Sequence, residues 1–327
     1  MQPQRIAVVG AGAIGGWLAA ALDKGGASVS LLARGQTLQT LRQHGLRVRH
    51  AQEESIHRLP ASSDARELGV QDVVFLAVKA PALPAVLPSL RALMGPGTTL
   101  VTAMNGVPWW FLHGLSLPFA ARPLSSVDPG GNVGQAVPLA SVVGGVVHAS
   151  CSLDAPATVR RHFGNQLILG EPDGSDSARL RGLVELLARG GIETRASARI
   201  QRDIWFKLWG NMTMNPISAL TGATTDRVLG DPDVRALVSA VMLEARAVGE
   251  KIGLPIDQEP EDRHAVTAKL GAFKTSMLQD VEAGRPVELD TLLGAVIELG
   301  QLTTTAMPFS RALMGLARVH AQTRGLY

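Results

Sequence analysis

Short apolar runs alternate with helical patterns through the first half of the chain. This alternation is typical of a parallel sheet covered by helices. The predicted strands are residues 5–9, 28–32, 73–77 and 98–102, with two further strands at 141–148 and 166–169. The predicted helices of this half lie near residues 15–24, 37–43 and 82–94.

Long helical patterns replace the alternation in the second half. Residues 171–177 are a cluster of turn formers and are the predicted linker. Because 327 residues are more than one core usually fills, we predict an α/β domain over residues 1–172 and an all-α domain over residues 173–327. Ligands tend to bind in the cleft between two such domains. The predicted helices lie near 178–190, 199–219, 231–252, 261–283, 288–305 and 309–324.

The turn after the first strand carries a glycine pattern. Gly10, Gly12 and Gly15 are spaced as GxGxxG between an apolar strand and a helix, which is the context in which this pattern indicates dinucleotide binding. Gly10 permits the tight turn, Gly12 lets the backbone approach a pyrophosphate, and Gly15 lets helix and strand pack closely. The helix start, with Ala13 and Ile14, offers N–H groups to the phosphates. A Rossmann-type domain is therefore expected.

Composition and charge exclude several classes of protein. The formal net charge is only +3, and the chain has one Tyr, so nucleic-acid binding is not expected. Histidine and cysteine spacing predicts no metal site. Residues 1–22 also resemble a signal peptide, but their glycines make a poor apolar helix. A single cysteine, Cys151, fits a reduced compartment, and no membrane span is apparent. The prediction is a soluble protein of the cytoplasm.

The end of the second predicted strand indicates which dinucleotide binds. NAD-binding units carry an acidic residue there, whereas an arginine accommodates the 2′-phosphate of NADP. Here the strand ends at Arg34 with no carboxylate beside it, so NADP is predicted. Lys79 follows the third strand and can reach the cofactor's phosphate or ribose. The alternatives are a solvated surface arginine and an ordinary loop lysine.

A polar row on the helix predicted at 199–219 is a candidate catalytic element. Lys207, Asn211 and Asn215 recur every four residues and share one helical face. Lys207 lies among Trp and Phe residues, and desolvation lowers a lysine pKa towards neutrality, which suits a proton donor. The alternative is that Lys207 reaches solvent while the asparagines cap a helix broken at Pro216.

A second cluster follows further along the chain. Ser276 and Asp280 precede a Gly–Pro break, and Glu288 stands in the first turn of the next predicted helix. A carboxylate is favoured at a helix start by the dipole alone, and a serine is common on a helix surface. By themselves these residues leave a structural and a functional interpretation open.

Together these motifs resemble the ketopantoate reductase (2-dehydropantoate 2-reductase) family over nearly the whole chain. The matching elements are Gly10–Gly15, Val78-Lys79, Asn105-Gly106, Lys207 with Asn211 and Asn215, Ser276–Asp280 and Glu288–Asp290.

The resemblance implies a role for each matching position. Lys207 would be the general acid towards the ketone oxygen, and Glu288 would hold the hydroxyl or ketone group. Asn105 would lie beside the nicotinamide ribose and the substrate. Ser276 would bind the substrate carboxylate, while Asn211 and Asn215 would line the pocket. The implied reaction is hydride transfer from NADPH to a 2-keto acid, with 2-dehydropantoate as the expected substrate.

Two regions depart from the family pattern and leave the substrate open. Trp109 and Trp110 follow the Asn105 loop, where smaller residues are expected, and the segment 128–156 differs as well. The tryptophans either reshape the pocket or only pack one domain against the other. Another bulky 2-keto acid is therefore an alternative substrate.

Two other functions and the assembly also stay open. A β-hydroxyacid or 6-phosphogluconate-type dehydrogenase has a similar build, and a non-catalytic NADPH sensor is a further alternative. A homodimer could form through the apolar faces of the helices predicted at 231–252 or 288–305. In the sequence, an apolar face in a dimer interface has the same pattern as one in a protein core.

Overall fold

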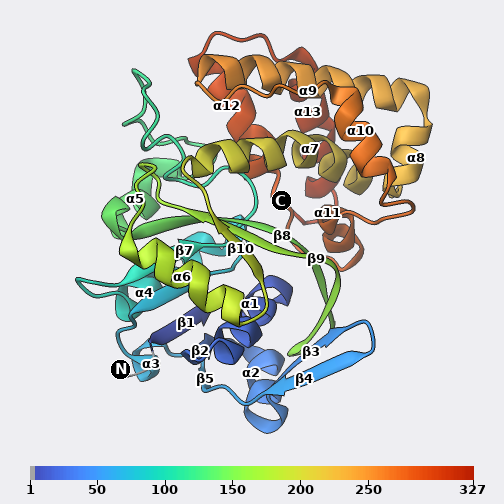
Figure 1. Cartoon of the computed structure of the whole chain (residues 1–327). Coiled ribbons are helices and arrows are strands. Elements are labelled where there is room, and N and C mark those ends of the chain that lie inside the picture. The colour runs from blue at the N-terminus through green and yellow to red at the C-terminus, as the bar shows by residue number, and fades with distance from the viewer. Residues whose placement is uncertain (1–3) are drawn as a thin grey trace. The chain divides into compact units, whose positions relative to one another are not determined.

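The computed structural model describes residues 4–327, which form two compact units (Figure 1). Unit 1 contains the residues up to Met104 together with Asn132–Ile200. Unit 2 contains Asn105–Gly131 and Gln201–Tyr327. Each unit is therefore built from two separate stretches of chain.

A ten-stranded sheet forms the centre of unit 1. Its order is β4-β3-β9-β8-β7-β6-β1-β2-β5, and β10 pairs with β9. The run from β8 to β5 is parallel throughout, whereas β8–β9 and β3–β4 are antiparallel pairs. The strands are β1 (Arg5–Val9), β2 (Ser28–Leu32), β3 (Leu46–His50), β4 (Glu53–His57), β5 (Ala61–Ser62), β6 (Val73–Leu76), β7 (Thr99–Thr102), β8 (Val142–Ala155), β9 (Thr158–Gly170) and β10 (Glu193–Ala196).

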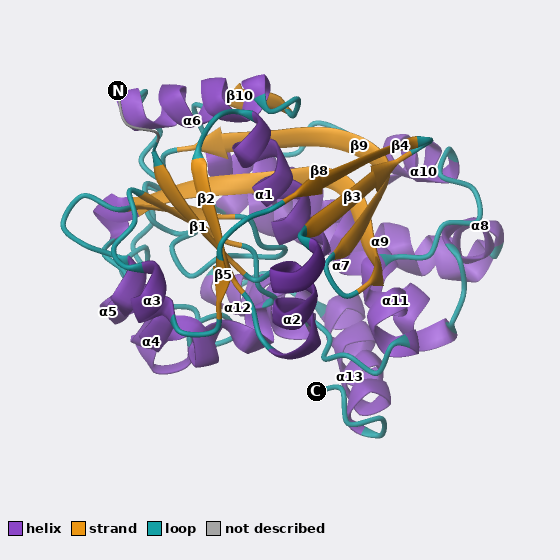
Figure 2. Ribbon diagram, turned by 90° about the horizontal axis from the view of Figure 1, so that it is seen from below, coloured by secondary structure: helices purple, strands orange, loops and turns teal. Residues whose placement is uncertain are grey.

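Apolar runs become the buried strands because both faces of the parallel sheet are covered. Ile6–Val9 and Val73–Leu76 are buried at every position. Helix α1 packs with α6, while α4 packs with α3 and α5, and Figure 2 shows these two groups on either side of β1 and β2. The helices are α1 (Ala13–Lys24), α2 (Gly35–His44), α3 (Ala65–Leu68), α4 (Leu83–Leu93), α5 (Asn132–Ala136) and α6 (Ala178–Arg189).

The turn-rich segment at 171–177 does not separate the units. Its Glu171 is buried and pairs with Arg179 at 2.5 Å, and Arg179 also donates to the carbonyl of Ala140 at 2.6 Å. Helix α6 then lies against α1 so closely that a Cβ on Gly190 would stand 2.0 Å from the Ala21 carbonyl oxygen. The contacts therefore divide the chain after Ile200, whereas the sequence placed the boundary at 172/173.

Unit 2 is helical apart from its loops. The expected helix at 261–283 is two helices, because the glycine-containing segment 269–275 interrupts it. The one expected at 288–305 begins as a single π-helical turn. The helices are α7 (Ile200–Thr221), α8 (Thr225–Gly230), α9 (Pro232–Lys251), α10 (Pro260–Ala268), α11 (Ser276–Glu282), η4 (Asp290–Gly294), α12 (Ala295–Leu302) and α13 (Pro308–Gln322).

The segment Asn105–Gly131 belongs with these helices although it follows β7 in sequence. Glu298 on α12 accepts hydrogen bonds from the backbone N–H groups of Ser125 and Ser126, both at 2.8 Å. Phe111 is fully buried and packs on Trp205 of α7, with ring centroids 6.0 Å apart. These contacts explain why a loop from the first half of the sequence is part of unit 2.

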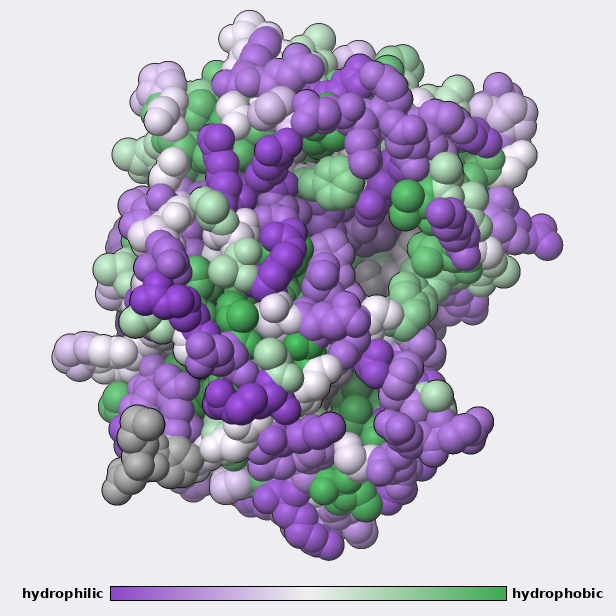
Figure 3. Space-filling view, viewed as in Figure 1, coloured by the Kyte–Doolittle hydropathy of each residue, from purple (hydrophilic) through white to green (hydrophobic). Residues whose placement is uncertain are grey.

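Polar side chains predominate on the face shown in Figure 3, where apolar ones form small separate patches. Within residues 4–327 no helix combines the length and the hydropathy needed to cross a bilayer.

Candidate active site

The three glycines of the turn after β1 have three distinct structural roles. Gly10 has a φ of +102°, and a Cβ there would lie 2.9 Å from the Ala77 carbonyl oxygen. A Cβ on Gly15 would lie 1.9 Å from the Gly10 carbonyl oxygen, so only glycine allows this turn to close. Around Gly12 a Cβ would meet nothing within 4 Å. Gly12 is the position at which a pyrophosphate approaches the backbone in this motif.

Helix α1 begins directly at this open position. Its N-cap is Gly12, no side chain caps the helix, and its first turn holds no acidic residue. The N–H groups of Ala13, Ile14 and Gly15 are therefore available to an anion, since the first turn of a helix has no intrahelical acceptors. The arrangement fits the diphosphate of a dinucleotide.

Arg34 and Lys79 lie next to the glycine turn through the sheet. The N–H of Gly10 donates to the carbonyl of Leu32 at the end of β2, and Arg34 follows two residues later with an exposed side chain. In the described part of the chain no carboxylate pairs with Arg34. Lys79 follows β6, which pairs with β1 on its other side, and is partly buried. Both cations suit a phosphorylated cofactor.

Helix α7 carries the polar row of unit 2. It runs unbroken from Ile200 to Thr221 through Pro216, so the asparagines do not cap a helix broken at that proline. Lys207 and Asn211 are partly buried and Asn215 is buried. Their four-residue spacing places them about one helical turn apart on the same face.

Asn105 reaches Lys207 from the loop after β7. The Lys207 Nζ donates to the Asn105 Oδ1 at 2.8 Å. The loop packs closely against Thr291 at the next residue, Gly106. This glycine has a φ of +80°, and a Cβ there would lie 2.7 Å from the Thr291 carbonyl oxygen. The Val107 N–H donates to that same oxygen at 2.8 Å. The close approach needs glycine and joins the loop to η4.

Glu288 precedes η4 and is buried. The N–H of Leu292 donates to the Glu288 carbonyl, so the residue stands at a helix start where the dipole stabilises a carboxylate. The chain end holds this segment: the Val287 N–H donates to the Leu326 carbonyl at 3.0 Å, and the Tyr327 hydroxyl donates to Asp290 at 2.7 Å. Single π-helical turns are frequent at functional sites, and this one follows the buried Glu288 directly.

The electrostatics of this cluster converge on Lys207. Burial lowers the pKa of Lys207 to about 8, the carboxylate of Glu288 opposes that fall, and the guanidinium of Arg263 adds to it. An ammonium with a pKa near the working pH is an efficient proton donor. Asn105, Lys207 and Glu288, proposed from widely separated positions in the sequence, therefore share one environment.

Ser276, Trp109 and Trp110 are the other residues of unit 2 that the sequence singled out. Ser276 is the first residue of α11, with an exposed side chain and no hydrogen bond between it and Lys207 in the described residues. Trp110 is buried, and Trp109 is partly buried with an indole N–H that finds no acceptor in the part of the chain described. The neighbouring Phe111 packs on Trp205, and both residues belong to unit 2.

Arg263 is the member of the cluster that sequence reasoning missed. It lies on α10, and its guanidinium carbon is 5.5 Å from the centre of the Phe206 ring on α7. No spacing relates it to Lys207, because the two residues meet only through helix packing.

Comparisons with known proteins cover both halves of the chain. The family described as ketopantoate reductase PanE/ApbA matches residues 6–109, and the C-terminal part of that family matches residues 199–321. A 2-dehydropantoate 2-reductase of Mesorhizobium japonicum is 42% identical over 324 residues, which is 99% of each chain.

Solved structures give the same result. A candidate ketopantoate reductase from Ralstonia solanacearum has a TM-score of 0.95 at 51% identity, with 99% of each chain covered. A 2-dehydropantoate 2-reductase from Methylococcus capsulatus has a TM-score of 0.83 at 28% identity, covering 98% of this chain and 97% of its own. Sequence and fold agree over the full length, and the chain belongs to the ketopantoate reductase PanE/ApbA family.

Proposed function

We propose that this chain reduces 2-dehydropantoate to pantoate with NADPH, using Lys207 as the general acid. The observation that carries the proposal is the Lys207 ammonium, whose pKa is lowered to about 8 by burial and which donates to Asn105 at 2.8 Å. The full-length relative that bears the name of this activity supports the choice of substrate.

Lys207 supplies the proton that the ketone oxygen needs. With a pKa of about 8, the group is mostly protonated at neutral pH. An ammonium has three N–H donors, and the bond to Asn105 uses one of them while fixing the direction of the others. Its positive charge also stabilises the negative charge that develops on the oxygen during reduction.

Glu288 and the asparagines complete the substrate contacts in this proposal. The Glu288 carboxylate favours the protonated form of Lys207 and accepts a hydrogen bond from the product hydroxyl. Asn211 and Asn215 offer amide donors and acceptors further along α7 for the hydroxyl group of the substrate that does not take part in the reaction.

NADPH supplies the hydride when it is bound. In unit 1, the open backbone at Gly12 and the N–H groups of Ala13 and Ile14 would bind its diphosphate. Arg34 would bind the 2′-phosphate, and Lys79 would bind a phosphate or ribose oxygen. Asn105 would contact the nicotinamide ribose. These assignments stay predictions.

A second substrate is favoured by one observation. Trp109 is partly buried four residues after Asn105, the residue that contacts Lys207, and an aromatic ring in this loop would change the shape of the substrate pocket, so another bulky 2-keto acid is the alternative. A panel of 2-keto acids that includes 2-dehydropantoate, with NADPH oxidation followed by absorbance, separates the two substrates. Turnover of 3-hydroxy acids with NADP⁺ and none of 2-keto acids would contradict both.

The homodimer and the cytoplasmic location also stay predictions. The fold buries the apolar face of α12 that was one candidate interface, whereas Leu316 and Val319 on α13 are 61% and 59% exposed.

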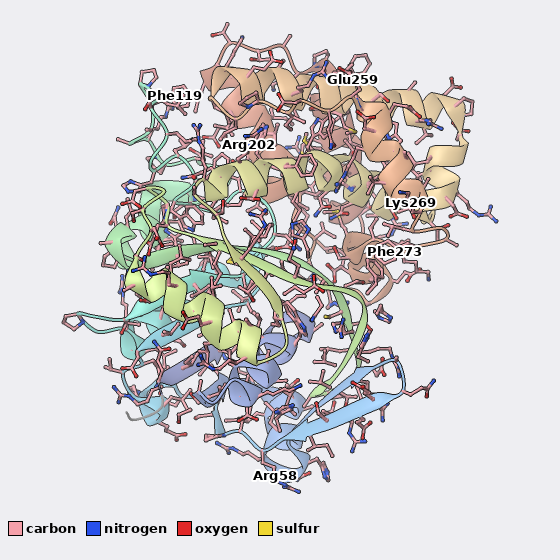
Figure 4. All side chains as sticks on the ribbon, in the orientation of Figure 1. Arg58, Phe119, Arg202, Glu259, Lys269 and Phe273 are labelled. Carbon is pink, nitrogen blue, oxygen red and sulfur yellow. The ribbon has the colours of Figure 1, made fainter. Side chains whose placement is uncertain are left out.

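The test of the proposed function is Lys207→Ala. We expect turnover of the 2-keto acid to fall by roughly 100-fold or more, the scale of a positioned acid, with NADPH affinity unchanged in a fluorescence titration. Lys269→Ala is the matched control, because Lys269 is an exposed lysine at the end of α10 (Figure 4). Turnover of Lys207→Ala equal to that of this control would reject Lys207 as the acid.

A further inference from the structure

Arg263 lies on α10 with its guanidinium against α7. In Figure 4, Glu259 and Lys269 mark the two ends of α10, and Arg202 marks the start of α7. A Cβ on Gly210 would stand 2.7 Å from the Arg263 Nε and 2.9 Å from its Nη2. Gly210 and Lys207 are three residues apart and are therefore neighbours on the helix surface. The guanidinium thus lies beside the catalytic lysine.

This guanidinium has no anionic partner among residues 4–327. Its Nε is buried without a hydrogen-bond acceptor, and its one side-chain interaction in the described residues is with the Phe206 ring. Two carboxylates near the start of α10 are paired elsewhere, because Glu259 accepts from Arg246 at 2.8 Å and Glu261 accepts from Arg235.

A buried cation without an acceptor is unfavourable, and a second buried cation beside it, here Lys207, makes it more so. Burial lowers the pKa of Arg263, and Arg263 in turn lowers the pKa of Lys207. An anion bound between the two side chains removes both penalties. A guanidinium presents its donors as a planar fork that matches the two oxygens of a carboxylate.

We infer that Arg263 binds the carboxylate of the substrate and selects 2-oxo acids over neutral ketones. The inference rests on the proposed function and names the group that recognises the acid. In a 2-oxo acid the carboxylate carbon is bonded directly to the ketone carbon, so the groups that bind the two must be neighbours. Lys207 and Arg263 meet this condition, whereas Ser276 has an exposed side chain and no hydrogen bond to Lys207 in the described residues.

The test compares an acid with its uncharged ester in two enzymes. The Arg263→Met variant keeps the length and apolar stem of the side chain and removes the charge. For 2-dehydropantoate we expect its KM to rise by roughly 10- to 100-fold, the scale of a charge-assisted hydrogen bond, with a smaller change in kcat. For the methyl ester of the same acid we expect KM to be nearly unchanged.

Equal losses for acid and ester would overturn the inference and assign Arg263 a packing role. A KM for the acid that does not change would overturn it as well. Folding is checked by thermal unfolding, where Arg263→Met is expected to match or exceed the parent, because the variant replaces an unpaired buried charge with an apolar group. Arg235→Met is the matched control, since that arginine is paired with Glu261, and both of its KM values should stay at the parent level.

A second variant displaces the guanidinium without removing it. The Gly210→Ala side chain needs the space that Nε and Nη2 now fill, while alanine favours the helix over glycine. We expect it to raise KM for the acid selectively and not to lower the unfolding temperature. Calorimetric binding of pantoate to the parent and to Arg263→Met keeps the inference testable if turnover fails: tenfold weaker binding supports it, and equal binding refutes it.

Discussion

The two groups of candidate site residues, one in each unit, are encoded in different ways. In unit 1 the glycine turn lies within consecutive residues, and the role of Gly15 is set by a backbone atom of Gly10. In unit 2 the hydrogen bond of Lys207 goes to Asn105, which is 102 residues away in sequence. Its pKa depends on Glu288 and Arg263, which come from two further elements.

The difference is between steric and electrostatic control. A Cβ added at Gly15 has no space beside the Gly10 carbonyl. The motif therefore tolerates little change in sequence and can be recognised from the sequence. The effect of a charge cluster is graded, because each charged neighbour contributes only part of the shift in the pKa of Lys207. Different combinations of neighbouring residues can therefore produce the same pKa. Substitutions in the two units should therefore have effects of different kinds.

The largest effect is expected for Gly15→Ala. Its Cβ would stand 1.9 Å from the Gly10 carbonyl oxygen, so backbone must move, and overpacking of this kind costs about 1–3 kcal/mol or more. We expect a lower unfolding temperature and a loss of NADPH binding in a fluorescence titration. Gly12→Ala is the control with open space around its Cβ: it should unfold at the parent temperature yet bind NADPH more weakly. Parent-like NADPH affinity in Gly15→Ala would contradict the steric explanation.

A smaller effect is expected for Arg34→Ala, because NADPH binding by unit 1 is expected to depend on charge at this position. The exposed Arg34 follows β2 with no carboxylate beside it in the sequence. Removing it should weaken NADPH binding by about 10- to 100-fold, as for a charge-assisted phosphate contact, and leave NADH binding nearly unchanged. Titration of both nucleotides checks the prediction, and equal losses for the two would refute Arg34 as the 2′-phosphate ligand.

The same contrast explains how much could be predicted from the sequence. The strands β1, β2, β6 and β7 were predicted to within one residue at each end, because a buried parallel strand has a continuous apolar run. The hairpin of β3 and β4 was missed, since its strands are mostly polar and partly exposed. The helix predicted at 261–283 failed because an apolar period alone does not show an interruption such as the one before Thr275.

The site followed a similar rule. Lys207 and Asn211 could be placed on one face, because helical periodicity is a local property. The role expected for Asn105 rested on a family resemblance that did not include its hydrogen bond to Lys207, and Arg263 gave no signal at all. Its position beside Lys207 depends on the packing of α10 against Gly210, which no spacing in the sequence records.

The smallest and most graded effect is expected in the pH profile of reduction. The acid must be protonated, and burial places the pKa of Lys207 at about 8. The kcat/KM for reduction should therefore be flat below pH 8 and fall about tenfold per pH unit above it, while oxidation of the hydroxy acid rises over the same range. Arg263→Met removes a cation that lowers this pKa, so the fall should move to higher pH. Glu288→Gln removes a carboxylate that raises it, so the fall should move to lower pH. A midpoint that stays fixed in both variants would show that a group other than Lys207 governs the profile.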